Sequence, residues 1–555
     1  MNLSIPKRTG TYADTLQAIG LADLVHALCS EEPLIVDLGS EFQVSVKGWN
    51  PESWGAPDPG YPYIWDSKKE PKPPAGQILD YRREVEKRDA AREAAKANAK
   101  ARKHIKDKLQ EQGVEAPEDP KPELALATIL ASMRKGWEGD RQLYRWLTEN
   151  RPRALLWTKH RLGLDGSGLQ DPKWSNTQFL NPITGKGVHS PKTVARAANA
   201  INAALTDPFE DWLRLRAVFA AMLAYRDGDD FKLFVLEPAQ ASPSMLAEIA
   251  ARLRKMNLWG GVKLDINAVL RCTVEMIRHS DIMGNGPVHL KGHIPRDIIQ
   301  GLRQAYFKSL GTAAALMGDT LFPLPDWFPI NTREEAGEML EIISEFIGSG
   351  DDSGCLGTLN EKYSDECSTL QQFRSWLTTG NLLDLLSFHA GFAVHLMRKR
   401  AMQEWNRPFS TERLTILLTK RYAMNEIVSN AGFISIAHAI RNATIYSTGD
   451  NAPVKINTRF GLAQEWKQKL RAGKEEFFAA VADFVQQYNW EVIDGFERTK
   501  RFKRKYHVVA TKDLDELSGL IQSHSAETVG LLLLAYGYAQ APKTEVKVPA
   551  EGENA

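Results

Sequence analysis

Hydrophobic residues recur at helical spacing over most of this 555-residue chain, and short alternating runs interrupt them in its first half. Apolar positions over 12–28 predict an amphipathic helix. The runs 34–38 and 42–47 that follow predict strands, as does 231–236. After residue 332 the helical period continues almost to the end of the chain. The pattern therefore predicts an α+β fold that is predominantly helical, with a large mixed N-terminal domain and a C-terminal helical bundle.

The C-terminal bundle is expected to contain four or five amphipathic helices. Their predicted ranges are 368–379, 381–404, 410–446, 459–494 and 511–540, and further helical patterns cover 122–149, 192–226 and 244–258. Thr332 with Glu335, and Ser368 with Gln371, have the spacing of capping boxes that begin helices. The expected division of the chain is an α+β domain over 1–357, a bundle over 358–542 and a disordered tail over 543–555.

The overall charge does not mark the chain as a nucleic-acid-binding protein, because 70 Lys and Arg residues face 69 Asp and Glu residues. Any binding of a polyanion must come from local basic patches. The four cysteines form no CxxC pair, the N-terminus lacks the apolar core of a signal peptide, and the apolar run 529–536 is too short to cross a bilayer. We therefore expect a cytoplasmic protein with no membrane partner.

The first basic patch lies on a long charged helix predicted over 77–112, an arm with few apolar anchors. Lys96, Lys100 and Lys103 fall at i, i+4 and i+7, so they share one helical face. Such a stripe can follow a phosphate backbone, because each neutralised phosphate releases counterions. The alternative interpretation is a solvated surface helix supported by pairs such as Glu84 with Arg88.

The second patch is a run of six cations between two predicted helices of the bundle. Its members are Arg498, Lys500, Arg501, Lys503, Arg504 and Lys505. Phe502 and Tyr506 are interleaved with them, so the segment offers cations for phosphates and aromatic faces for bases. It is predicted to hold a nucleic-acid strand, and the alternative is a solvated loop.

The third patch is the polar, glycine-rich stretch that begins near residue 151. Its candidate DNA-binding residues are Lys159, Arg161, Asn181, Thr184, Lys186 and Lys192. Small residues allow close approach of the backbone to DNA, and Asn, Thr and Lys can contact groove edges and phosphates. The stretch is not a P-loop, because Gly187 follows Lys186. A plain surface loop is the alternative, and the Trp and Tyr residues of 49–65 are expected to pin another long loop to the core.

One feature points towards an enzyme. RDGDD at 226–230 precedes a predicted strand, and paired carboxylates such as Asp229 and Asp230 hold two magnesium ions in palm-type nucleotidyl transferases. An acidic turn explains the same residues, and no second carboxylate strand stands out. HExxH and GxSxG motifs are absent. We therefore expect no catalytic residue, no cofactor and no metal site.

Blocks of the C-terminal part resemble the large subunit, the eighth-numbered Cas family, of type I CRISPR-Cas Cascade complexes. The similarity covers roughly a third of the chain. The residues that carry it are GFISIAHAIRNATI at 432–445, then Arg459, Phe460, Gly461, Leu462, Glu465 and Trp466, then Phe478, Phe484, Tyr488 and Asn489, with a weaker similarity in FLNPITGKGV at 179–188. The aromatic loop and the charged helical arm have no counterpart in the family.

The resemblance implies a non-catalytic protein that acts with guide RNA (crRNA), target DNA and the other Cascade subunits. Such a subunit recognises the protospacer-adjacent motif in duplex DNA, helps open the duplex and stabilises the R-loop, while guide pairing supplies sequence specificity. It then recruits a helicase-nuclease or transposition proteins. The residues of 159–192 would contact the flanking duplex, with Asn181 reading a base edge. The alternatives are a palm-type enzyme and a helical scaffold without a nucleic-acid role.

Overall fold

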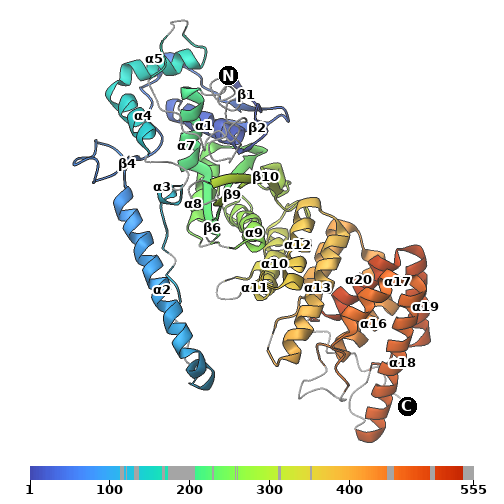
Figure 1. The fold of residues 1–555 in the computed structure, drawn as a ribbon. Helices are drawn as coiled ribbons and strands as arrows, with labels where there is room; N and C mark the ends of the chain where they lie inside the picture. The colour runs from blue at the N-terminus through green and yellow to red at the C-terminus, as the bar shows by residue number, and fades with distance from the viewer. Residues whose placement is uncertain are drawn as a thin grey trace, which may run out of the picture.

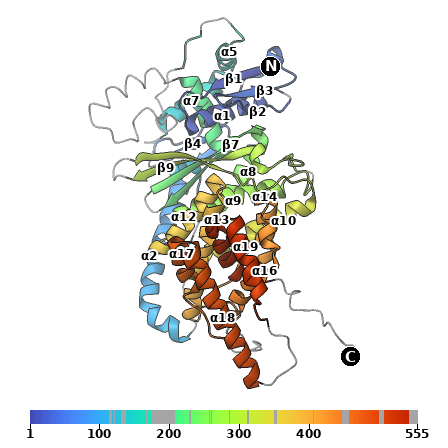
Figure 2. The same ribbon diagram turned by 90° about the vertical axis from the view of Figure 1, so that its right-hand side faces the viewer.

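The computed structural model of the chain describes residues 1–29, 31–112, 118–120, 122–130, 137–165, 169–172, 207–227, 230–256, 258, 260–284, 286–309, 314–349, 353–404, 406–446, 456–499 and 507–541. The chain stacks two sheets and a helical bundle into an elongated molecule, with a long helix standing off to one side (Figures 1 and 2). The α+β, predominantly helical class predicted from the sequence is confirmed.

A four-stranded antiparallel sheet occupies the middle of the molecule, in the order β10-β9-β7-β6. Its strands are β6 (Met222–Asp227), β7 (Asp230–Pro238), β9 (Ile299–Ser309) and β10 (Ala314–Pro323). The rings of Phe231 and Phe307 stack on one face, where Tyr12 also packs, and Lys232 points to the other face. Strand β7 is therefore buried on both sides, which explains its nearly continuous apolar sequence.

Helices cover both faces of this central sheet. They are α1 (Tyr12–Leu28) and α7 (Pro208–Ala221) on one side, with α8 (Pro243–Arg254) and α9 (Val262–Arg278) on the other. Helices α1 and α7 approach so closely at Gly20 that a Cβ atom there would lie 1.8 Å from the carbonyl oxygen of Leu213. Glycine at this position permits the contact.

A second four-stranded antiparallel sheet lies beside the first, in the order β1-β3-β2-β8. Its strands are β1 (Asn2–Pro6), β2 (Leu34–Asp37), β3 (Glu41–Ser45) and β8 (Gln240–Ala241). Because β8 follows β7 after one residue, the two sheets are joined covalently as well as by packing. The predicted helix and strand pair at the start of the chain are confirmed.

The charged arm leaves the body through a small parallel pair of strands. These elements are β4 (Tyr63–Trp65), β5 (Ile78–Asp80) and α2 (Tyr81–Gln112), with η1 (Pro51–Ser53) before them and α3 (Leu126–Ile129), α4 (Glu138–Glu149) and α5 (Arg151–Arg161) after them. The predicted helix over 77–112 begins four residues late, because 78–80 pairs with β4.

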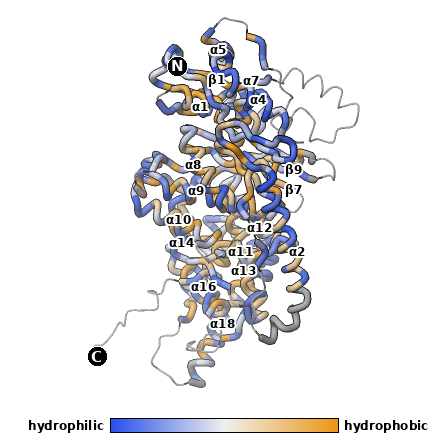
Figure 3. Tube along the Cα trace, turned by 90° about the vertical axis from the view of Figure 1, so that its left-hand side faces the viewer, coloured by the Kyte–Doolittle hydropathy of each residue, from blue (hydrophilic) through white to orange (hydrophobic). Residues whose placement is uncertain are grey.

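The C-terminal bundle wraps around one central helix, α20. Its elements are α12 (Ser364–Thr379), α13 (Leu382–Ala401), α14 (Thr411–Tyr422), α15 (Asn425–Val428), α16 (Ala431–Ala443), α17 (Leu462–Ala472), α18 (Lys474–Thr499), α19 (Thr511–Ser523) and α20 (Ala526–Gly537). Every residue from 529 to 537 is buried, which accounts for the apolar run in the sequence. Figure 3 shows hydrophobic segments running through the sheets and the bundle. In the described part of the chain, no helix has the length and apolar character needed to cross a membrane.

Packing is continuous between the sheet and the bundle across residue 357. The helices α10 (Arg333–Ile347) and α11 (Gly354–Thr358) follow strand β10, and the short helix η5 (Pro295–Asp297) precedes strand β9. Trp327 stacks on Trp376 of α12 with ring centroids 5.3 Å apart. Arg374 of α12 forms an ion pair of 2.9 Å with the buried Asp265 of α9. Residues 543–555, the predicted tail, lie outside the described residues.

Several predicted helices are divided by residues that end a helix. The predicted helix 410–446 breaks at Ala423, which has φ 53°, and again after the short α15, where the side chain of Asn430 caps α16. Gly473, with φ 139°, divides 459–494 into α17 and α18. Ser525 caps α20 and divides 511–540. Apolar periodicity survives such short interruptions, so the pattern alone does not reveal them.

Three further differences concern helix starts and ends. The predicted helix 122–149 consists of α3 and α4, and α7 ends at Ala221, where strand β6 begins. The capping box of Thr332 and Glu335 is confirmed. The box predicted at Ser368 is wrong, because α12 begins at Ser364 and Ser368 lies within it.

Candidate nucleic-acid interface

The arm α2 contacts the body mainly at its root. Arg82 pairs with Asp66 at 2.6 Å, and Glu84 accepts a hydrogen bond of 3.1 Å from the amide of Ala125. Farther along, Arg102 pairs with Asp119 at 2.9 Å, so the segment that follows the arm runs back along it. No residue from 81 to 102 is buried. The helix thus stands in solvent on nearly all sides (Figure 1).

The predicted stripe on the arm is present and largely exposed. Lys96 forms an exposed ion pair of 2.6 Å with Glu93. Lys100 is exposed and has no ion pair among the described residues, and the same is true of Arg92, one turn before Lys96. Lys103 lies on α2, and its side chain is outside the described part. The sequence analysis missed Arg92, which extends the row of cations towards the root.

Helix α5 supplies the described part of the predicted DNA-binding stretch. Arg161 pairs with Asp207, and its guanidinium lies 5.5 Å from the centre of the Phe209 ring. Asp207 also caps α7 by accepting from the amide of Phe209 at 2.8 Å. Arg161 therefore fastens α5 to the start of α7. This structural role was not foreseen. Lys159 is half-exposed, without an ion pair in the described part.

The remaining predicted residues of that stretch, Asn181, Thr184, Lys186 and Lys192, lie outside the described residues. So do Lys500, Arg501, Lys503, Arg504 and Lys505 of the second patch. Arg498 is on the last turn of α18, and its side chain is also outside the described part. The structure therefore places the helices before and after these patches.

The chain returns from the second patch through a well-packed strap, residues 507–510, between α16 and α18. Asn489 holds Val509 by two hydrogen bonds, of 2.8 and 3.0 Å. The hydroxyl of Ser435 donates to Asp513 at 2.6 Å and lies 3.1 Å from Nε2 of His507. The Ser435 hydroxyl donates its hydrogen bond to the Asp513 carboxylate and not to the His507 ring. The three side chains therefore hold the strap in place, and the histidine does not activate the serine as a nucleophile.

A pair of histidines also joins the strap to α16. The ring of His438 on α16 lies 4.4 Å from that of His507, centre to centre. Burial, with the nearby His507 and Arg441, lowers the pKa of His438 to about 4. Burial also lowers the pKa of His507. Both rings are therefore neutral at pH 7 and pack against each other between α16 and the strap.

A cluster of cations that the sequence analysis missed lies where α12, α13 and α17 meet. Lys467 is half-buried on α17 and has no ion pair among the described residues. Burial lowers its pKa, Arg471 one turn away lowers it further, and the charge of Asp365 opposes the shift. Arg398 of α13 reaches the same Asp365 at 3.2 Å. The sequence feature that could have revealed this cluster is the like-charge pair of Lys467 and Arg471 at i, i+4, because such a pair destabilises an isolated helix.

The aromatic loop has the anchoring role expected of it. Trp54, Tyr61 and Tyr63 are buried. The indole of Trp212 on α7 donates to the carbonyl of Pro59 at 2.9 Å. Tyr61 packs between Tyr144 of α4 and Phe219 of α7, and Tyr63 also packs on Tyr144, so these faces are not available for stacking on bases.

The carboxylates of the candidate palm motif lie at the β6–β7 hairpin. Asp227 and Asp230 are register partners at its end, and Asp229 lies outside the described residues. Asp230 accepts a hydrogen bond of 2.6 Å from the hydroxyl of Tyr306. Within the described part of the chain, no group of three or more His, Cys, Asp or Glu side chains is placed to hold a metal ion.

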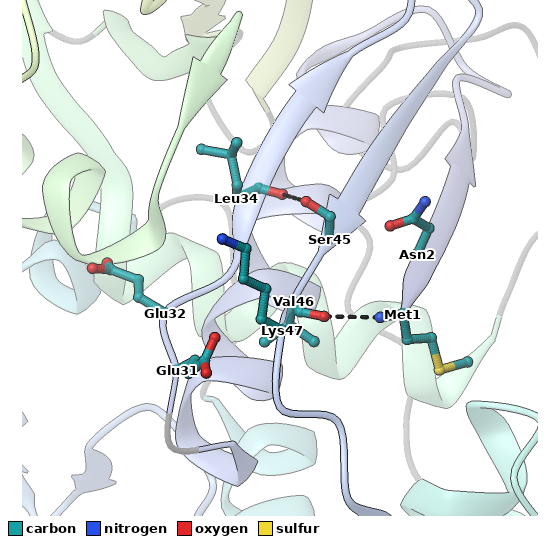
Figure 4. Close-up of a pocket in the computed structure, with 8 residues that line it drawn as sticks. All are labelled: Met1, Asn2, Glu31, Glu32, Leu34, Ser45, Val46 and Lys47. Atoms are coloured by element: carbon teal, nitrogen blue, oxygen red, sulfur yellow. Dashed lines mark hydrogen bonds between the residues drawn. The ribbon is translucent and has the colours of Figure 1, made fainter.

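A hollow of about 720 Å³ lies at the open end of the N-terminal sheet (Figure 4). Glu31, Glu32 and Lys47 supply its charged side chains, and Val46 accepts a hydrogen bond across its edge (Figure 4). Burial opposes ionisation of Glu32, but hydrogen bonds from Ser244 and Ser242 outweigh it and lower its pKa. The two carboxylates balance the ammonium groups of Lys47 and Met1, so the hollow has no excess of positive charge with which to hold a polyanion.

The comparisons with known proteins add no relative. No protein-family model matches the chain, and no curated protein matches its sequence.

Proposed function

We propose that this protein is the non-catalytic large subunit of a type I CRISPR guide-RNA surveillance complex in the cytoplasm. In this role it holds guide RNA and target DNA together with the other Cascade subunits. It recognises the protospacer-adjacent motif, helps open the duplex, stabilises the R-loop, and recruits a helicase-nuclease or transposition proteins. The motif resemblance supports the family, and the distribution of charge supports the nucleic-acid role.

The observation that carries the proposal is Lys467, a half-buried lysine that has no ion pair among the described residues. A half-buried ammonium beside another cation is held in the fold against its own preference, since desolvation and like charge both disfavour it. Groups whose pKa is shifted by desolvation and by neighbouring charges are concentrated at functional sites, and an external anion would offset both effects here. Arg398 and Arg471 lie around the same point, so the surface suits consecutive phosphates better than a single small anion.

The resemblance assigns the finer roles. Lys159, Asn181, Thr184, Lys186 and Lys192 are proposed to contact the flanking duplex, with Asn181 reading a base edge. The cations of 498–505 are proposed to hold a displaced strand or the guide backbone. Replacing Asn181, Lys186 and Lys192 by alanine in the assembled complex should abolish discrimination between correct and incorrect flanks, measured by duplex binding. Unchanged discrimination would show that another loop reads the flank.

Lys467→Met tests the nucleic-acid role with two readouts of opposite sign. Loss of one phosphate contact should weaken binding of a nucleic acid of about 30 nucleotides and lower the salt slope of log K by about 0.7 to 0.9. Loss of the like-charge neighbour should stabilise the bundle by about 0.2–0.5 kcal/mol in urea unfolding.

The matched control is Lys469→Met, which removes another lysine of α17, one that is partly exposed and pairs with Glu476 of α18 at 3.1 Å. It should leave both the salt slope and the unfolding free energy nearly unchanged. If Lys467→Met stabilises the bundle and binding is unaffected, the cluster does not hold nucleic acid. Binding by the wild type that does not weaken with salt would overturn the nucleic-acid role altogether, since phosphate contacts are salt-sensitive.

A further inference from the structure

Four cations follow each other along the arm at four-residue intervals: Arg88, Arg92, Lys96 and Lys100. Four residues of α-helix rise about 6 Å, so the row is about 18 Å long and drifts slowly around the helix. Each neighbouring pair is a like-charge i, i+4 pair, which destabilises a helix by about 0.2–0.5 kcal/mol. The arrangement is therefore unfavourable for the arm alone.

Little in the chain neutralises this row. Arg88 pairs with the adjacent Asp89 at 3.1 Å, and Lys96 pairs with Glu93 at 2.6 Å. All four of these side chains are at least 35% exposed. Exposed pairs of this kind contribute about 0–1 kcal/mol, so a phosphate can displace either carboxylate. Arg92 and Lys100 have no ion pair among the described residues.

The shape of the arm restricts what it can bind. The helix is 32 residues long, and its root is fixed to the body by Arg82 and Glu84. It stands apart from the bundle in Figure 1, and the side chains of Arg92, Lys96 and Lys100 are exposed. A straight charged rod suits a straight, stiff polyanion.

We propose that the arm binds the sugar-phosphate backbone of double-stranded DNA, with the row lying along one strand. The proposal deepens the proposed function and depends on it. A row of about 18 Å spans about five base steps at 3.4 Å each, so its four cations can reach phosphates within that stretch of the strand. The contact carries no sequence information and positions the duplex.

The composition of the arm favours a duplex over a single strand. Tyr81, at the root, is the only Phe, Trp or Tyr residue in 81–112. Proteins that hold single strands combine cations with aromatic side chains on which the bases stack. The arm offers cations without stacking faces, so a paired backbone whose bases are already stacked is the better match.

The test replaces Arg88, Arg92, Lys96 and Lys100 together by glutamine in the full chain. Glutamine is a good helix former, and removal of the like-charge row should preserve or raise helicity measured by circular dichroism. Binding to a fluorescent duplex of about 30 bp should weaken, and the salt slope of log K should fall by about 3 to 4. A single strand of equal length should lose much less affinity.

The matched control removes the same number of charges from the body surface. Lys255, Lys291, Arg333 and Lys362 are exposed, have no ion pair among the described residues, and change to glutamine in the control. If the control lowers the salt slope as much as the arm variant does, net charge explains the effect and the arm is not a site. If single-strand binding falls as far as duplex binding, the duplex assignment is wrong.

These outcomes separate this inference from the proposed function. A wild-type chain that binds neither duplex nor single strand contradicts both. A wild type that binds with a steep salt slope, together with an arm variant of unchanged slope, contradicts the arm alone and leaves the nucleic-acid role to the bundle and α5.

Discussion

The central sheet and the arm α2 use the same charged residue types in opposite ways. At the sheet, Lys232 pairs with Asp265 at 2.5 Å, and Arg303 pairs with Glu237 at 3.1 Å. Both carboxylates are almost completely buried. On the arm, Lys96 and its partner Glu93 are both more than half exposed.

The difference decides what each charge can do. A charge that has been removed from water must keep its partner, because leaving it alone in the interior costs several kcal/mol. An exposed charge loses little when its partner changes, so it is free to exchange a carboxylate for a phosphate. Ion pairing in the sheet therefore fixes the fold, whereas pairing on the arm leaves binding capacity.

The largest expected effect on the free energy of unfolding comes from replacing an ion-paired aspartate by alanine, once beside the sheet and once on the arm. Asp265→Ala leaves the buried ammonium of Lys232 without its carboxylate and removes the partner of Arg374, so we expect a loss of about 3–5 kcal/mol in the free energy of unfolding. Asp89→Ala on the arm should change it by less than about 0.5 kcal/mol. Urea unfolding measures both.

A second variant tests whether the loss of stability comes from the unpaired buried charge and not merely from the loss of a side chain. Replacing Lys232 by methionine together with Asp265→Leu removes both buried charges and should recover much of the loss. Equal destabilisation by Asp265→Ala and Asp89→Ala would contradict the comparison, because burial would then have no influence on the strength of the pairs.

Acid should next separate the arm from the packed body of the molecule, through His389 of α13 in the bundle. Its ring packs edge-on against Phe409 at 4.9 Å, and burial lowers its pKa to about 3. The unfolded chain binds this proton below about pH 6.5 and the folded chain does not, so unfolding becomes easier as the pH falls from about 6.5 towards 3. Stability should drop by about 2 kcal/mol between about pH 7 and pH 5 from this group.

His389→Leu provides the check, because leucine keeps most of the volume and binds no proton. Chemical unfolding at several pH values should show a shallower loss of stability in this variant than in the wild type. An identical slope would mean that the folded chain protonates this imidazole as readily as the unfolded chain does, which would contradict the prediction. Helicity of the arm should not follow this titration, since no part of it packs on α13.

The sequence was informative where one physical signal dominated. Alternating or continuous apolar runs predicted β3 and β7, and the bundle followed from helical periodicity. The divisions at Ala423, Gly473 and Ser525 were missed because apolar positions resume in nearly the same phase after each break. Strand β6 was read as helix, because its apolar residues directly continue those of α7.

The candidate site shows the limits of the same reasoning. Lys96 and Lys100 could be placed on one face because helical spacing fixes their geometry. The role of Arg161 could not be found, because Asp207, its partner, lies 46 residues away in the chain. Lys467 was overlooked for a similar reason, since its surroundings come from α12 and α13. Local spacing predicts faces of helices, but pairing across elements requires the fold.

The smallest expected effect tests the comparison through its sign. Glu93→Gln on the arm removes the exposed partner of Lys96, so duplex affinity at low salt should rise about twofold, as expected for one Coulomb contact near water. The gain should disappear at high salt, which screens exposed charges within a few ångströms.

Glu237→Gln makes the same change in the sheet, where the carboxylate holds both Arg303 and Thr15, and should cost stability without raising affinity. Loss of a carboxylate would then improve binding in one region and weaken the fold in the other, and titrations of both variants at two salt concentrations measure this. Affinity that stays constant in Glu93→Gln would mean that Lys96 does not reach the duplex.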